Sequence, residues 1–320
     1  MKYKLEKNLP YSLLRLNWKC NANCLFCNVP AESFKSLKEP SAEEIKQEMK
    51  KLAKTNEQTR ISLSGGEPTL RQDLTELIKY AKKNKVKTIE IQTNAIFLEN
   101  RNFVKKLKKA GLDKAFVGLH SHLPQTHDYL VGLKGAFNKC LAGTKNLIKE
   151  KVEVILNPVI TAKNYKTLPD FIKFIKKETP QIKCVSLSVV QPRGRAWTNK
   201  KIVPSYKEIS SYVEKALALG KKTGIIINNP YCGLPLCVGG WWKYLDQCVE
   251  FSEKYLEKAK NNLQKNYTLP EEEKTKSARC LFCDLNEFCN GVWDEYSQIH
   301  SLSDLKPIRL SRKEKTQYNI

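Results

Sequence analysis

Residues 13–27 read LLRLNWKCNANCLFC, a short run rich in leucine that leads directly into three closely spaced cysteines. The run at 13–18 predicts a β-strand, and Cys20, Cys24 and Cys27 fall in the loop that follows it. Three thiolates within eight residues can bind three irons of a cubane cluster and leave the fourth iron without a protein ligand. A structural zinc site is the alternative, although zinc sites usually present pairs of cysteines and four closed ligands.

A second motif, SGGEP at residues 64–68, closes another predicted strand at 61–64. Gly65 and Gly66 permit close backbone approach and unusual dihedral angles at a strand end. The carboxylate of Glu67, which Pro68 follows, could form a charge-assisted hydrogen bond with the ammonium group of a ligand. The alternative is a tight turn between strand and helix with an exposed glutamate.

The first two-thirds of the chain alternate between short β-rich runs and segments with helical periodicity. Ser41 with Glu44, and later Ser205 with Glu208, have the spacing of a capping box before a helix. The predicted strands are residues 13–18, 61–64, 88–93, 114–119, 152–159 and 184–190. The predicted helices lie near residues 45–53, 71–83, 102–110, 137–148, 165–177 and 205–220. Six strands separated by helices predict an α/β fold, a partial (β/α)6 parallel barrel with its chemistry at the carboxyl ends of the strands.

The cysteine motif after the first strand and SGGEP after the second together resemble the radical S-adenosylmethionine (SAM) superfamily. The resemblance covers roughly residues 10–225. It implies a 4Fe–4S cluster bound by Cys20, Cys24 and Cys27, with SAM on the free iron and residues 65–68 beside it. It also implies that an electron from the cluster splits a carbon–sulfur bond of SAM to give a 5′-deoxyadenosyl radical. An external one-electron donor of the ferredoxin or flavodoxin type would supply that electron.

Polar residues at the ends of later strands are further candidates for contacts with SAM. Thr93 and Asn94 stand where the family often carries Thr-Asn-Gly, but alanine occupies position 95 here, so the turn could differ. Asn157 and Ser188 are candidates for the ribose and carboxylate of SAM, and buried hydrogen-bonded polar residues are the alternative. Arg195, after the sixth strand, could clamp a carboxylate, or it could belong to a surface turn.

Four other residues near the predicted barrel invite a functional interpretation. His120, His122 and His127 follow the fourth strand and are candidates for substrate contact. Cys184 opens the sixth strand and is a weak candidate for a hydrogen-atom donor inside the barrel.

A second group of cysteines near the end of the chain has the pattern Cys280-x2-Cys283-x5-Cys289. It resembles the SPASM and twitch domains of many radical SAM enzymes, and it implies an auxiliary 4Fe–4S cluster. Trp293 stands where full SPASM domains continue with another cysteine, which favours one auxiliary cluster over two. A zinc site is the alternative. The fourth ligand is expected from one of three upstream cysteines, Cys232, Cys237 and Cys248.

The amino-acid composition changes after residue 228, where Pro, Gly, Trp and Cys become frequent. We therefore expect a radical SAM core at residues 1–228, a SPASM/twitch-like domain at 229–307 and a loose basic tail at 308–320. One polar helix is expected within the second of these regions, near residues 251–265.

Charge and hydropathy limit the partners and the cellular location. The 56 Lys and Arg residues against 33 Asp and Glu give a formal net charge of +23, which is compatible with a nucleic-acid partner. The sequence shows neither an apolar run long enough to span a membrane nor a signal peptide at its N-terminus. We therefore expect a cytoplasmic protein whose thiols are reduced and available to metals.

Three functions remain open from the sequence. The resemblance to SPASM and twitch enzymes favours modification of a peptide or protein, although the barrel begins so early that no preceding peptide-recognition domain is expected. An enzyme of cofactor biosynthesis or tRNA modification is the alternative. The third hypothesis is an electron-transfer or zinc-binding protein, and SGGEP argues against it.

Overall fold

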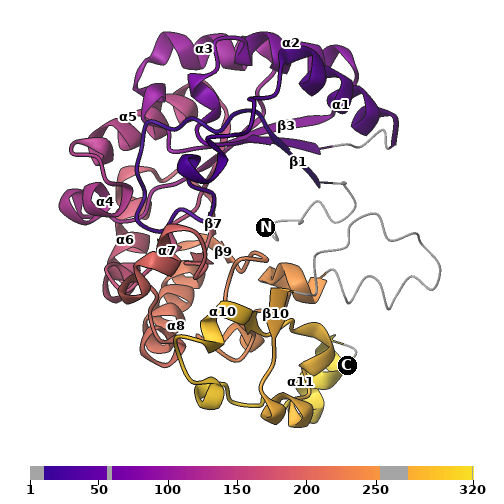
Figure 1. The fold of residues 1–320 in the computed structure, drawn as a ribbon. Coiled ribbons are helices and arrows are strands. Elements are labelled where there is room, and N and C mark those ends of the chain that lie inside the picture. Colours follow the sequence, from indigo (N-terminus) through magenta and orange to yellow (C-terminus); the bar gives the residue numbers. More distant parts are fainter. Residues whose placement is uncertain (1–10, 56–59, 253–272, 319) are drawn as a thin grey trace.

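The computed structural model describes residues 11–55, 60–252, 273–318 and 320. Seven parallel strands form one curved sheet in the order β1-β2-β3-β4-β5-β7-β9 (Figure 1). In that order, the strands span Tyr11–Arg15, Arg60–Ser64, Thr88–Thr93, Lys114–Val117, Glu153–Leu156, Cys184–Ser186 and Ile226–Asn228. Within these ranges β1 pairs with β2 alone and β9 with β7 alone, so the barrel is open between them. The predicted α/β fold with a partial parallel barrel is confirmed.

Helices connect successive strands and cover the outside of the sheet (Figure 1). In chain order, they are α1 (Ala42–Thr55), α2 (Leu74–Lys83), α3 (Arg101–Ala110), α4 (Pro124–Val131), α5 (Ala136–Lys149), α6 (Leu168–Glu178) and α8 (Tyr206–Thr223). Helix α2 shows why they pack there, because its buried residues Leu74, Leu77, Ile78 and Ala81 recur at helical spacing. Full burial of each such leucine or isoleucine contributes about 1.5–3 kcal/mol. The helices therefore hold the carboxyl ends of the strands at one rim.

The two predicted capping boxes have different outcomes. At α1, the Glu44 amide donates to the Ser41 hydroxyl at 3.2 Å and the Ser41 amide donates to the Glu44 carboxylate at 2.7 Å, as predicted. At α8, Ser205 is the N-cap residue, but its side chain caps no backbone amide. The Tyr206 amide donates instead to the Tyr296 hydroxyl at 2.8 Å, so a C-terminal residue replaces the local cap.

Three strand boundaries differ from the prediction. The predicted strand 152–159 is divided into β5 and β6 (Val159–Ile160), since Pro158 lacks the N–H needed to continue the ladder. The predicted strand 184–190 is similarly divided into β7 and β8 (Ser188–Val189), and β6 pairs with β8 in a separate small sheet. The prediction of six strands also missed β9, whose three residues lie directly before Asn229-Pro230 and give little periodic signal.

The C-terminal region is built from turns around a short hairpin, and it lies below the curved sheet in Figure 1, next to α8. The hairpin pairs β10 (Lys274–Thr275) with β11 (Val292–Trp293) in antiparallel orientation. Three short helical segments, η9 (Ala278–Phe282), η10 (Asn286–Phe288) and α10 (Asp294–Ser297), carry or flank the late cysteines. Most of the polar helix expected near 251–265 lies outside the described residues.

The prediction of a loose tail after residue 307 is wrong. Helix α11 spans Arg312–Tyr318, and Ser311 and Glu314 form a capping box before it. The ring of Tyr318 packs against Phe251 at 5.7 Å between centroids. The spacing of Ser311 and Glu314 was visible in the sequence, but the prediction of a loose tail relied on the basic composition of this region instead. None of the helices in the described ranges is long and apolar enough to cross a membrane.

Candidate functional site

The loop that carries Cys20, Cys24 and Cys27 follows β1 and is held against the SGGEP turn by backbone hydrogen bonds. The Gly66 amide donates to the Asn17 carbonyl at 2.9 Å, and the Glu67 amide donates to the Lys19 carbonyl at 2.8 Å. A Cβ on Gly66 would lie 2.1 Å from the Lys19 carbonyl oxygen. The close backbone approach predicted for the two glycines is therefore made by the cysteine loop itself.

The thiols of this loop are close enough to affect one another's ionisation. Burial raises the pKa of the Cys24 thiol to about 12, and the thiols of Cys27 and Cys20 push it in the same direction. Burial also raises the pKa values of Cys20 and Cys27 above their ordinary range. Such mutual destabilisation of thiolates is relieved when a cationic metal group binds them.

The carboxylate of Glu67 is buried and accepts four hydrogen bonds from the protein. The donors are the backbone amide and hydroxyl of Thr69 at 3.1 and 2.6 Å, the hydroxyl of Thr93 at 2.7 Å and the amide of Asn94 at 2.8 Å. Burial raises the pKa of Glu67, whereas these donors lower it. A carboxylate has about four acceptor sites. Glu67 thus fastens the ends of β2 and β3 together: its Oε1 accepts three of these hydrogen bonds and its Oε2 accepts one.

The turn after β3 keeps the shape that glycine would favour. Ala95 has a φ angle of +57°, in the left-handed region that costs a non-glycine residue about 1–2 kcal/mol. The Ala95 amide donates to the Thr93 hydroxyl at 2.9 Å, which supports this conformation. The side-chain amide of Asn94 donates to the Asn21 side chain at 2.7 Å and lies 3.9 Å from the Cys20 sulfur. Asn94 therefore contacts the cysteine loop, whereas the hydroxyl of Thr93 stabilises the turn by hydrogen bonds within it.

Asn157 and Ser188 meet at the rim, as expected of neighbours on adjacent strands. The Asn157 amide donates to the Ser188 hydroxyl at 2.6 Å, and the hydroxyl lies 3.1 Å from the sulfur of Cys232. Cys184 is the first residue of the neighbouring strand β7, and the Asn228 side chain donates to its sulfur at 3.3 Å. Burial raises the pKa of Cys184 to about 12.

Arg195 contacts the cysteine loop and Glu32. Its guanidinium donates from Nε and Nη2 to the two oxygens of Glu32, each at 2.6 Å, and from Nη1 to the Cys24 carbonyl at 3.3 Å. The hydrogen bond from Arg195 lowers the pKa of Glu32 to about 2. Arg195 therefore does more than belong to a surface turn, and the carboxylate that its guanidinium binds here is that of Glu32. No local pattern indicated its partner, because Glu32 is 163 positions away.

The histidines after β4 pack beneath the cysteine loop. His120 is buried, contacts the ring of Phe26 edge-on at 4.8 Å and accepts the Val159 amide through Nδ1 at 3.2 Å. His127 accepts the His120 amide through Nδ1 at 3.2 Å, and burial lowers its pKa to about 4. Both rings are therefore neutral packing groups at pH 7. The half-buried His122 is placed against Phe174.

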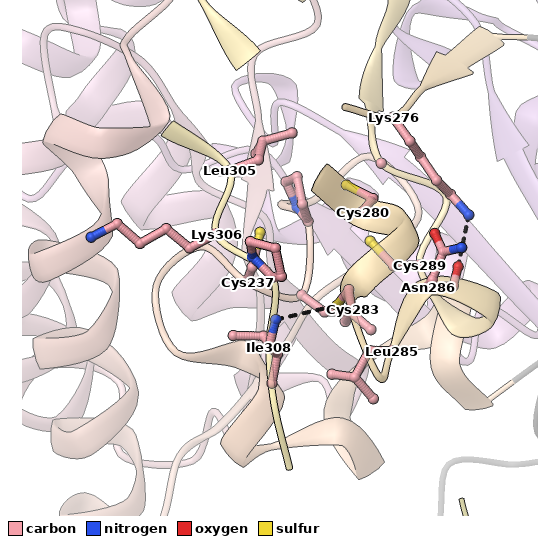
Figure 2. A pocket seen from close by; sticks show the side chains of 14 residues that line it. Cys237, Lys276, Cys280, Cys283, Leu285, Asn286, Cys289, Leu305, Lys306 and Ile308 are labelled. Carbon is pink, nitrogen blue, oxygen red and sulfur yellow. Dashed lines mark hydrogen bonds between the residues drawn. The ribbon is translucent and has the colours of Figure 1, made fainter. Parts of the chain in front are cut away.

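The late cysteines line a common pocket with one upstream cysteine (Figure 2). The four are Cys237, Cys280, Cys283 and Cys289. Burial, together with a smaller effect of the Cys289 thiol, raises the pKa of Cys237 to about 12. Among the other candidates, Cys232 lies at the barrel rim, and Cys248 is buried with its thiol donating to the Tyr244 carbonyl at 3.4 Å.

The chemistry of this pocket fits a thiolate-bound metal group. Leu236, Leu285 and Leu305 supply apolar walls, and the Ile308 amide donates to the Cys283 sulfur at 3.3 Å. Hydrogen bonds of this kind and low solvent exposure tune iron–sulfur clusters. Over the parts of the chain that the structure describes, no three Cys, His, Asp or Glu side chains already stand at metal-binding separations. The four thiols surround the pocket without meeting at a point.

The comparison with protein families identifies the first site. Residues 19–175 match the model of the Radical SAM superfamily, and the match includes the cysteine loop and the SGGEP turn. The chain belongs to the radical SAM superfamily. Membership implies a 4Fe–4S cluster and bound SAM, and the three thiols of Cys20, Cys24 and Cys27 on one loop are the kind of donor set that fits the first of these.

Two relatives in sequence match about three-fifths of this chain. The Fe-coproporphyrin III synthase of Methanosarcina barkeri is 32% identical over 191 residues, which are 60% of this chain and 47% of the synthase. A probable GTP 3′,8-cyclase of Saccharolobus islandicus is 30% identical over 203 residues, 63% of this chain and 64% of the cyclase. The match therefore spans less than two-thirds of either relative.

Solved structures share the fold over a greater length. Native anSMEcpe with bound AdoMet has a TM-score of 0.64 at 15% identity and covers 98% of this chain and 95% of its own. Streptococcus suis SuiB bound to S-adenosylmethionine has a TM-score of 0.60 at 16% identity, covering 93% of this chain and 76% of its own. At such identities the likeness concerns the fold, and it extends through the C-terminal region of this radical SAM protein.

Proposed function

We propose that this chain reductively cleaves SAM at a 4Fe–4S cluster held by Cys20, Cys24 and Cys27, and that the resulting 5′-deoxyadenosyl radical modifies a peptide or protein. The observation that carries the substrate class is the pocket with four cysteines in the C-terminal region. Such a pocket suits an auxiliary 4Fe–4S cluster in a SPASM/twitch-like domain, and enzymes with these domains mostly act on peptides or proteins. Two structural neighbours are described with bound peptides, SuiB with its precursor peptide SuiA and anSMEcpe with a Kp18Cys peptide.

The residues around the first cluster then have distinct parts. Gly65 and Gly66 let the cysteine loop pack on the turn, and Glu67 fixes that turn from inside. Asn94 and the pair Asn157–Ser188 are the side chains we assign to direct contact with SAM, together with the backbone up to Pro68.

In the second site, we propose Cys237 as the fourth ligand beside Cys280, Cys283 and Cys289, because it lines the same pocket. We propose an acidic one-electron carrier of the ferredoxin or flavodoxin type as the external donor. A cytoplasmic location follows from that donor and from the need to keep the thiols reduced.

A second candidate function is modification of a small molecule in cofactor biosynthesis. The relatives in sequence favour it, since one is described as a tetrapyrrole synthase and the other as a nucleotide cyclase. The +23 charge leaves an RNA substrate as a variant of this second candidate.

Iron counting under anaerobic conditions tests the proposed cofactors. The reconstituted chain should hold about eight irons, and a triple Cys20/Cys24/Cys27→Ala variant should hold about four and release no 5′-deoxyadenosine with dithionite. Zinc retained in the triple variant without iron would overturn the auxiliary cluster. No iron in the wild-type chain would overturn the whole proposal.

The substrate class can be tested with extracts of the source cell. A low-molecular-weight fraction should stimulate release of 5′-deoxyadenosine, and protease treatment of that fraction should abolish the effect. Stimulation that survives protease but not nuclease would indicate RNA. Stimulation that survives both treatments would favour the small-molecule candidate.

A further inference from the structure

Residues 191–195, with the sequence QPRGR, follow β8 and contact both cysteine-bearing regions. Arg195 reaches the loop that carries Cys20, Cys24 and Cys27, and Arg193 reaches the C-terminal hairpin. The two arginines are separated by Gly194 alone. The segment therefore makes polar contacts with both regions within a few residues.

The loop that carries Cys20, Cys24 and Cys27, called the cluster loop below, is contacted by backbone as well as side-chain groups of this segment. The Arg195 amide donates to the Cys27 carbonyl at 3.0 Å, and its guanidinium donates to the Cys24 carbonyl at 3.3 Å. The side chain of Asn28, directly after the last cysteine of the loop, donates to the Gln191 side chain. These bonds fix the carbonyl groups of two of the three proposed ligands.

Gly194 is required by the geometry of the segment. Its φ angle of +55° combines with a ψ angle of −127°, a region that side chains with a Cβ avoid. A Cβ at this position would also lie 2.4 Å from the Cys27 carbonyl oxygen. The glycine therefore allows contact with the cluster loop and lets the flanking arginines reach different partners.

Contacts on the other side tie Arg193 to the C-terminal hairpin. Its Nε donates to Glu295 on α10 at 2.6 Å, and its Nη1 lies 2.8 Å from the Glu273 carboxylate. The guanidinium also lies over the ring of Trp293 at 5.3 Å from the centroid. Trp293 is buried and follows Cys289 by four positions.

We propose that residues 191–195 form a bracket that sets the cluster loop relative to the C-terminal domain, with Arg193 as a positioning residue for the SAM-binding cluster. The proposal rests on the proposed function. Arg193 touches none of the proposed ligands and acts through Gly194 and the bond from Arg195 to Cys27. Coupling between two sites is reciprocal, so disturbance of either end of the bracket must reach the other.

Hydrogen exchange of the reconstituted full chain tests this reciprocity. In Arg193→Met, amides of residues 20–28 should exchange about fivefold faster, and in Arg195→Met those of residues 289–297 should do the same. The matched control is Arg101→Met, which removes a surface ion pair with Glu150 at 2.7 Å on α3. It should change neither segment.

A spectroscopic measurement separates positioning from a merely structural role. The electron paramagnetic resonance spectrum of the reduced SAM-bound cluster should shift in Arg193→Met while the iron content stays at the wild-type value. Arg193→Lys, which keeps the charge, should restore most of the wild-type spectrum. If the methionine variant does not fold, Glu295→Gln, which weakens the partner of the Arg193 Nε, takes its place and should shift the spectrum in the same way.

Exchange that accelerates only at the mutated end, with an unchanged spectrum, would overturn the bracket. That result would leave the proposed function intact, because it is compatible with full iron content and release of 5′-deoxyadenosine. Conversely, loss of the proposed function in the wild-type chain would show as missing iron, while exchange between the two segments could still be compared.

Discussion

Replacement of Gly66 by alanine places a methyl group where the cluster loop already lies. The new Cβ would stand 2.1 Å from the Lys19 carbonyl oxygen and 2.5 Å from that of Trp18, and both neighbours are backbone atoms. Ordinary contacts need about 3.5 Å, so the loop that leads into Cys20 must move by about 1 Å. Such overpacking costs about 1–3 kcal/mol.

The same movement strains two hydrogen bonds that hold the loop on the turn. They join the Gly66 amide to the Asn17 carbonyl and the Glu67 amide to the Lys19 carbonyl. With about 1 kcal/mol for each, the total loss in unfolding free energy is about 3–5 kcal/mol. Because the displaced segment precedes Cys20 by one residue, we expect Gly66→Ala to lose the first cluster and to keep the second.

Urea unfolding and an iron count on the anaerobically reconstituted variant check this expectation. Iron should fall from about eight to about four per chain, and SAM should no longer bind. The control is Gly224→Ala, whose Cβ meets nothing within 4 Å although its φ angle is +75°. It should cost about 1–2 kcal/mol through backbone strain and keep all the iron. Gly66→Ala with wild-type iron and SAM binding would refute the assignment of the turn as the support of the cluster loop.

Three further changes follow from the site. Glu67→Gln presents an NH2 group to existing donors and should lower the unfolding free energy, measured in urea, by about 1–3 kcal/mol. An unchanged unfolding free energy would show that the Glu67 carboxylate does not stabilise the turn. Cys237→Ser should lose about four irons whereas Cys248→Ser should lose none, and the reverse result would exchange their roles. The folded chain holds His127 neutral with its pKa lowered to about 4 by burial, so the unfolded chain gains a proton first as pH falls below about 6.5. Stability should therefore drop by about 2 kcal/mol between pH 7 and pH 5, less in His127→Gln, and equal urea titrations of the two proteins would contradict this reasoning.

Local patterns in the sequence predicted the parts of the site that local physics determines. The spacing of Cys20, Cys24 and Cys27 after a strand placed them in one loop, and the paired glycines after the next strand predicted a close backbone approach, which the cysteine loop makes. Helical periodicity and the cap at Ser41 gave the order of strands and helices in the barrel.

Contacts between distant residues could not be predicted in this way. Arg195 was interpreted as a carboxylate clamp or as part of a surface turn, because nothing near it in sequence indicates its bond with Glu32. The choice among three upstream cysteines depended on how the loop after β9 folds, and only Cys237 of the three lines the pocket in the described part of the chain. The protein donors to the Glu67 carboxylate could not be predicted for the same reason, since two of the four come from the next strand and the residue after it.

The substrate question lies in the part of the chain that the family match does not reach. That match ends at residue 175, whereas the pocket begins at residue 235 and extends to residue 308. The two relatives in sequence match 60–63% of this chain and leave the remainder unmatched. The structural neighbours that cover 93–98% of the chain are 15–16% identical, so over the C-terminal region they show the fold alone. Because the proposed bracket at residues 191–195 contacts both regions, a change in the C-terminal region should alter the environment of the loop that carries Cys20, Cys24 and Cys27.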